Sequence, residues 1–117
     1  MSGLSVPLID RALLKAGIAS GAKSGDVGQP PAADVAGCSN LSFVVVANGT
    51  VSAGAVQIEE SHDVAYTGTW AAVGTPITAA TGTVAVAKAN NTAKAVRARI
   101  STAVTGGGSV DVIITGR

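Results

Sequence analysis

Apolar and polar side chains alternate with a period of two residues in the last quarter of the chain. In residues 95–101, three apolar residues alternate with Arg97 and Arg99, and residues 109–115 repeat the same pattern. A strand with this pattern buries one face and leaves the other in contact with water. Helical spacing would instead need apolar residues three and four apart. The sequence therefore predicts two β-strands here.

These two strands are separated only by residues 102–108, which are rich in glycine. A loop of this kind typically joins the two strands of an antiparallel hairpin. If Ile100 pairs with Val110, Arg99 lies opposite Asp111 on the outer face as an opposite-charge pair. We therefore expect a hairpin with this register.

Further strand patterns precede this region. They cover residues 41–47, 52–61, 64–73 and 83–89, with turn signals at Asn48-Gly49, Gly74–Pro76 and Asn90-Asn91. Asn-Gly is a strong signal for a two-residue hairpin turn. About six short strands with closely spaced turns are typical of a β-sandwich. We predict an all-β fold, with a β-sandwich or jelly-roll-like domain over residues 38–117.

Small side chains dominate the sequence. Alanine, valine, glycine, threonine and serine occur 22, 16, 15, 11 and 10 times among 117 residues. Each of these side chains buries little area, so the predicted core is thin and we expect contacts with neighbouring proteins to add stability. A net charge of +1 and only three aromatic residues argue against binding to nucleic acid. The longest strictly apolar run, Phe43–Ala47, is too short to span a membrane.

The first 37 residues have a different character. Residues 7–16 combine Pro7, apolar residues at helical spacing and a following Gly17, which predicts a short helix. Residues 17–37 read as a linker rich in glycine, serine and proline. We therefore interpret residues 1–37 as an N-terminal arm that docks on a neighbouring subunit. Its apolar anchors are predicted to be Leu8, Ile9, Leu13 and Leu14.

No group of residues has the spacing of a catalytic, cofactor or metal site. Ser61, His62 and Asp63 contain the residue types of a hydrolytic triad, but consecutive strand residues point to opposite faces. Glu59 and Glu60 are better explained as a solvated or subunit-facing pair matched by the two arginines at residues 97 and 99 than as an acid–base pair. We expect no enzyme activity and no cofactor. The single cysteine, Cys38, is expected to be a buried small apolar residue.

Tyr66 and Trp70 lie four residues apart, so on one strand they would share a face. Two interpretations are open. Buried, they would anchor a core that is otherwise made of small residues, which is the interpretation that we favour. Exposed, they would form a platform on which a sugar ring stacks.

Several segments together resemble the small β-rich decoration, or cement, proteins that coat the heads of tailed bacteriophages. The resemblance extends over about residues 52–117 and lies in the order and style of segments Val56–Ser61, Tyr66–Trp70, Val73–Ile77, Val96–Ser101 and Gly107–Arg117. It implies a structural virion protein that clamps neighbouring coat subunits. Its implied partners are the major capsid protein and copies of itself, within a homo-oligomeric assembly.

The function that we expect is therefore capsid decoration, with the protein made in the host cytoplasm and located on the capsid surface. The first residues show no basic segment followed by a long apolar one, so we expect no secretion by a signal peptide. One alternative is a carbohydrate-binding or adhesion module that uses Tyr66 and Trp70. Another is a connector protein in the neck or tail of the virion.

Overall fold

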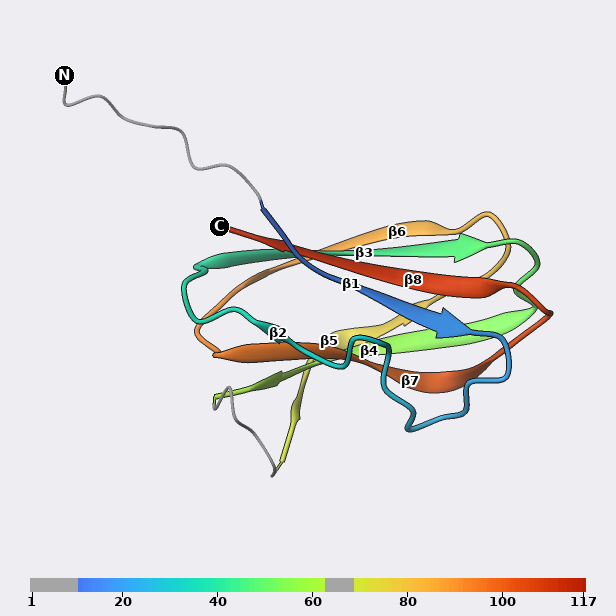
Figure 1. The fold of residues 1–117 in the computed structure, drawn as a ribbon, viewed down its shortest axis with the longest axis horizontal. Coiled ribbons are helices and arrows are strands. Elements are labelled where there is room, and N and C mark those ends of the chain that lie inside the picture. The colour runs from blue at the N-terminus through green and yellow to red at the C-terminus, as the bar shows by residue number, and fades with distance from the viewer. Residues whose placement is uncertain (1–10, 63–68) are drawn as a thin grey trace, which may run out of the picture.

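The computed structural model describes residues 11–62 and 69–117 of the chain. Within this part all regular structure is β-strand, which confirms the predicted all-β class (Figure 1). The strands are β1 (Arg11–Ala19), β2 (Ala33–Asp34), β3 (Asn40–Asn48), β4 (Ala53–Ser61), β5 (Ala71–Thr78), β6 (Val84–Asn90), β7 (Ala95–Thr105) and β8 (Ser109–Gly116).

The strands form two four-stranded antiparallel sheets that face each other. Sheet A has the order β1-β8-β3-β6, and sheet B has the order β2-β7-β4-β5. The first strand thus pairs with the last, the second with the seventh, the third with the sixth and the fourth with the fifth. This nested pairing is that of one long antiparallel hairpin wrapped into two layers, as in a jelly roll.

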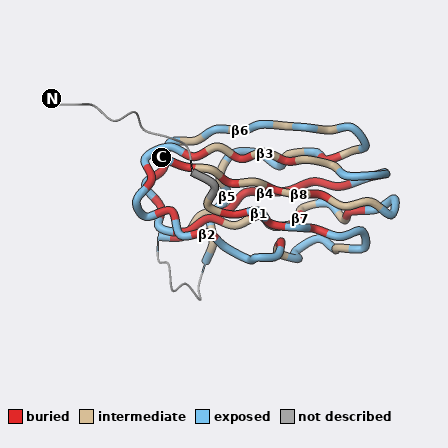
Figure 2. Tube along the Cα trace, turned by 45° about the horizontal axis from the view of Figure 1, so that its top comes forward, coloured by how far each residue is buried: buried red, intermediate tan, exposed pale blue. Residues whose placement is uncertain are grey.

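The core lies between the two sheets and is built mainly from alternate residues of β1, β3, β4, β7 and β8 (Figure 2). Most of its members are valine, isoleucine or alanine, and Phe43 is its one aromatic side chain among the described residues. In β7 and β8 the apolar residues of the alternating pattern are all buried, as predicted: Val96, Ala98, Ile100, Val110, Val112 and Ile114. Cys38 is also buried, as expected.

The predicted helix over residues 7–16 is wrong for residues 11–16, which belong to β1; residues 7–10 lie outside the described part. β1 pairs with β8 along its whole length. Leu14, Ala16 and Ile18 are buried while Lys15 is exposed, so this segment follows the two-residue period of a strand. Pairing with β8 and burial against the core outweigh the helix propensity of an alanine- and leucine-rich segment.

Residues 17–37 also belong to the sandwich instead of forming a linker to a separate arm. The amides of Gly25 and Gly28 donate to the carbonyls of Ile100 and Ala98, and the Ile100 amide donates to the carbonyl of Asp26. These bonds place residues 25–28 along the free side of β7, where they continue the edge that β2 forms. The predicted boundary at residue 37 therefore does not separate two structural units.

The predicted hairpin of residues 95–101 with residues 109–115 is also wrong, although both strands exist. β7 lies in sheet B and β8 in sheet A, so the loop between them crosses from one layer to the other. Arg99 lies opposite Gln57 of β4, and Asp111 lies opposite Gly17 and Val46. The turn at Asn48-Gly49 likewise leads from sheet A to sheet B and makes no hairpin.

A buried amide holds the connection between β6 and β7 against the segment that precedes β3. Asn91 is 9% exposed, and its Nδ2 lies 3.0, 2.9 and 3.2 Å from the carbonyl oxygens of Val35, Cys38 and Ala93. Its Oδ1 accepts a hydrogen bond from the Ala93 amide at 3.0 Å. One side chain therefore satisfies backbone groups from both segments, which water does not reach.

We predict that Asn91→Ala lowers the free energy of unfolding by about 2–3 kcal/mol, because buried carbonyls lose their donor. The neighbouring exposed Asn90 provides a matched control: Asn90→Ala should change stability by less than about 0.5 kcal/mol. Chemical denaturation followed by circular dichroism measures both values. Equal stabilities of the two variants would contradict a structural role for the Asn91 amide.

Candidate functional site on the outer sheet faces

The outer face of sheet B carries a three-residue charge cluster. β4 and β7 place Glu59 opposite Arg97, with Arg99 one step further along β7 on the same face. Glu59 Oε1 accepts a hydrogen bond from Arg97 Nε at 2.9 Å and lies 2.9 Å from Arg97 Nη2, and Oε2 accepts from Arg99 Nε at 2.9 Å. The predicted pairing of this glutamate with both arginines is therefore confirmed. Glu60 instead lies near His62, with 3.9 Å between Oε1 and Nε2.

The Glu59 cluster is largely shielded from solvent. The side chains of Glu59, Arg97 and Arg99 are 10%, 23% and 31% exposed. One carboxylate serves two guanidinium groups, so the cluster carries an excess positive charge. Removing the carboxylate would leave two neighbouring cations with no counter-charge in a partly buried position, which is more costly than losing an exposed ion pair.

Trp70 extends this cluster at the start of β5. The Arg97 guanidinium carbon lies 4.4 Å from the centre of the Trp70 ring, which is within the range of a cation–π contact. Trp70 is half-buried on the outer side of sheet B, so the prediction that it anchors the core is wrong for this residue. Tyr66 lies outside the described residues. Arg97 thus joins the carboxylate of Glu59 to an aromatic ring.

Gln57 is a buried structural residue on this sheet that sequence reasoning missed. It is 6% exposed, and its Nε2 lies 2.8 Å from the carbonyl oxygen of Ile58 and 3.3 Å from those of Val73 and Gly74. The register of β4 with β5 shifts beside it, and Gly74 adopts a φ of 69°. The predicted turn at Gly74–Pro76 is therefore a bulge inside β5. Glycine and proline within a strand pattern are the sequence signal for such a bulge.

The outer face of sheet A has a different character. Five apolar side chains from three adjacent strands lie on it in cross-strand register, and we call them the valine face: Val44, Val46, Val84, Val86 and Ile113. Val84 and Val86 are 68% and 59% exposed, and the other three are half-buried. β6 and the outward residues of β3 accordingly appear in the exposed and intermediate colours of Figure 2.

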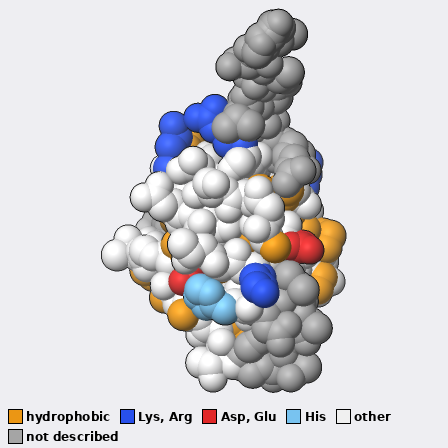
Figure 3. Space-filling view, turned by 90° about the vertical axis from the view of Figure 1, so that its left-hand side faces the viewer, with side chains coloured by type: hydrophobic (Ala, Val, Ile, Leu, Met, Phe, Trp, Pro, Cys, Tyr) orange, Lys and Arg blue, Asp and Glu red, His pale blue; other side chains and the backbone are white. Residues whose placement is uncertain are grey.

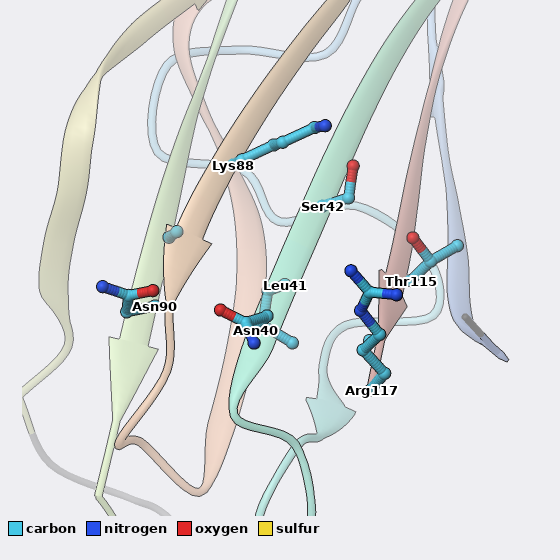
Figure 4. Close-up of a pocket in the computed structure, with 9 residues that line it drawn as sticks. Asn40, Leu41, Ser42, Lys88, Asn90, Thr115 and Arg117 are labelled. Atoms are coloured by element: carbon cyan, nitrogen blue, oxygen red, sulfur yellow. The ribbon is translucent and has the colours of Figure 1, made fainter. Parts of the chain in front are cut away.

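Polar residues border the valine face at both ends. At one end Asp111 accepts a hydrogen bond from Asn48 Nδ2 at 2.9 Å and lies 3.7 Å from the ammonium group of Lys15. At the other end lies a shallow hollow of about 430 Å³ (Figure 4). Its polar lining comes from Asn40, Ser42, Lys88, Asn90, Thr115 and Arg117.

This hollow can form hydrogen bonds and can attract an anionic group, because Lys88 and Arg117 add two cations to neutral amides and hydroxyls. The end of the sandwich nearby shows scattered charges and scattered apolar side chains in Figure 3, with no continuous apolar patch on its described part. Among residues 11–62 and 69–117, no group of three or more His, Cys, Asp and Glu could hold a metal ion. The described part also contains no helix able to cross a membrane.

The predicted arm anchors have two different outcomes. Leu14 is 9% exposed and belongs to the core of its own domain, and Leu13 packs against that core. Leu14 is therefore already covered by this chain itself and is not available as an anchor for a neighbour. Leu8 and Ile9 lie outside the described residues. Of the triad residue types, Ser61 is buried and His62 is exposed, while Asp63 lies outside the described part.

Comparison with protein-family models, with curated proteins and with solved structures found no match for this chain.

We predict that Glu59→Gln lowers the free energy of unfolding by about 1–3 kcal/mol, because two partly buried guanidinium groups lose their counter-charge. Glu60→Gln is the matched control on the adjacent residue, and its effect should stay below about 1 kcal/mol. Urea unfolding at low salt measures both. A Glu59→Gln variant as stable as Glu60→Gln would show that the cluster does not stabilise sheet B.

Proposed function

We propose that this chain is a structural virion protein that decorates the head of a tailed bacteriophage and stabilises it by bridging neighbouring coat subunits. The observation that carries the proposal is the valine face on sheet A. A flat apolar surface with a polar border has the composition of a protein-binding surface, because its centre is easily dehydrated and its border gives orientation.

The arrangement of the strands supports the same assignment. Jelly rolls occur among viral capsid proteins and among lectins, and both belong to the functions that the sequence suggests. The fold alone does not decide between them, because one fold hosts many functions. The apolar surface that the described residues present is on sheet A, away from Trp70, which favours a protein partner over a glycan.

The valine face replaces Leu13 and Leu14 as the surface offered to a coat subunit. Both leucines contribute to the chain's own core, so a deletion of residues 1–37 would remove β1 and β2 and unfold the domain. A deletion of residues 1–10 is the appropriate test of the predicted anchors Leu8 and Ile9, because it leaves every described strand in place.

We predict that the chain is present on purified phage heads in a ratio near one to the major coat protein, or in a small-integer fraction of it. A lattice-covering protein must follow the symmetry of the coat. Quantitative mass spectrometry of particles banded on a density gradient gives this ratio. A handful of copies per particle would instead assign the chain to the neck or tail, and its absence would overturn the virion proposal.

Two variants connect this result to the structure. Val44→Lys places a charge in the middle of the valine face and should weaken binding to undecorated heads at least tenfold. Thr78→Lys adds the same charge to an exposed position in sheet B and should leave binding unchanged. Deletion of residues 1–10 measures the contribution of Leu8 and Ile9 to head binding separately from that of the valine face.

A second function, carbohydrate binding, is favoured by one observation: Trp70 lies outside the core, on the outer side of sheet B. A half-buried indole beside a guanidinium group resembles the mixed aromatic and polar lining of many ligand sites. One face of the ring is covered by Arg97, so a sugar would stack on what Arg97 leaves open.

We predict, under this second function, that Trp70→Ala abolishes binding to a glycan array while the thermal unfolding midpoint falls by only a few degrees. The protein stays folded because Trp70 contributes little to the core. Thr69→Ala, at the exposed neighbouring residue, keeps both the indole and Arg97 and serves as the control. A wild-type chain that binds no glycan on the array would dismiss this function.

A further inference from the structure

Among the described residues, β6 is the open edge of the sandwich. The other three edge strands each carry a feature that hinders pairing with another chain. β1 is bridged by Gln29, whose amide and carbonyl bond to Gly17 at 3.1 and 2.7 Å, and β1 also contains a bulge. β2 has two residues and follows Pro30 and Pro31, and β5 contains the bulge at Gly74 and a proline. β6 has neither proline nor bulge and pairs with β3 in unbroken register.

The hydrogen-bond pattern identifies which backbone groups of β6 face outward. The Ala47 amide donates to the Thr83 carbonyl at 3.0 Å, so this pair is hydrogen-bonded. In an antiparallel ladder, hydrogen-bonded pairs alternate with pairs that are not hydrogen-bonded. The backbone groups of residues 85, 87 and 89 therefore bond to β3. The amides and carbonyls of Val84, Val86 and Lys88 therefore point away from β3. Among the described residues, no strand lies beyond them.

The side chains of the same three residues lie on the outer face of sheet A, where Val84 and Val86 are the most exposed large apolar residues described. Outward backbone groups and exposed apolar side chains thus belong to the same residues. An added antiparallel strand would satisfy the backbone groups and cover the valines together.

We propose that β6 pairs antiparallel with β6 of a second copy of this chain, which joins the two A sheets into one. The strand is complementary to itself: with Val86 opposite Val86 of the partner copy, Lys88 lies opposite a valine, so no like charges face each other. A two-fold axis through this pair places both valine faces on the same side. The dimer forms whether or not the chain binds a phage head.

The pairing surface is small, since β6 has seven residues. Contacts of this size give weak, concentration-dependent dimers, well below the area of a typical stable interface. When many copies sit on one surface, the effective concentration of neighbours is high and a weak pairing becomes important. We therefore expect a dimer that is detectable in solution only at high protein concentration.

Sedimentation velocity of the full chain over a wide concentration range tests the proposal. Wild-type protein should show reversible dimer formation. Val86→Lys and Val86→Glu should each weaken the dimer at least tenfold, because like charges then meet across the two-fold axis. An equimolar mixture of the two variants should dimerise again, because the charges are now opposite. Circular dichroism confirms that each variant is folded.

Val44→Lys is the matched control, because Val44 lies on the same face but one strand inside the edge. It should leave the dimer unchanged while weakening head binding, so failure of this inference and failure of the proposed function are distinguishable. Hydrogen exchange should slow at the amides of residues 84, 86 and 88 as concentration rises, and not at residues 85 and 87.

Three results would overturn the proposal: a wild-type chain that stays monomeric up to about 1 mM, a mixture of the charge variants that stays monomeric, or a dimer that Val44→Lys disrupts and Val86→Lys does not. The last result would identify the valine face, and not the β6 edge, as the contact between copies.

Discussion

The pairing of β1 with β8 is the constraint on which the rest of the structure depends. It brings residues about 100 positions apart into one ladder, with Arg11 opposite Gly116 at its far end. β8 then lies between β1 and β3, and its inward apolar side chains, Val110, Val112 and Ile114, are fully buried. Every other pair of strands is nested inside this closure. Folding to this arrangement depends on contacts of high sequence separation, which typically makes folding slow.

The small side chains of this chain explain why its two outer faces differ. A core of valine, alanine and isoleucine contributes little area per residue, so sheet B gains further order from its outer side. There Gln57 holds the bulge of β5, and Glu59 joins two arginines, one of which covers Trp70. On sheet A the described outer network, Asp111 with Asn48 and Lys15, lies at one end of the valine face. Its valine face is instead bare, and covering it requires another molecule.

The features that depend on local pattern could be predicted from the sequence, and those that depend on distant partners could not. Alternation gave the strands of residues 95–101 and 109–115 and their buried sides correctly, because side-chain direction follows from period alone. The partner strand was wrong, because consecutive strands here alternate between sheets. Among the described strands, the only neighbours in sequence that also pair are β4 and β5. A hairpin rule that favours sequential neighbours fails for a nested hairpin.

The same distinction applies to the site. Glu59 could be matched to Arg97 and Arg99 because opposite charges in strand patterns attract partners across a sheet. Trp70 could not be placed, because its position along β4 depends on the register shift further along β5, around Gly74. The helix predicted over residues 7–16 is wrong for residues 11–16 for a related reason. Leu14, Ala16 and Ile18 satisfy a strand period only when β8 is there to receive them.

The two sheet faces and the open edge give the molecule a directional surface. On the outer face of sheet B, charged side chains of the sheet contact one another. Three of the four sheet edges carry proline, a bulge or a bridging residue. The exposed apolar side chains and the outward-pointing backbone groups of β6 therefore lie together at the edge of sheet A. A protein that must lie flat on a surface and also touch its neighbours needs these two properties side by side. Apolar contact contributes to binding a surface, and backbone pairing fixes the orientation of a neighbouring strand. β6 can therefore contribute to both kinds of contact.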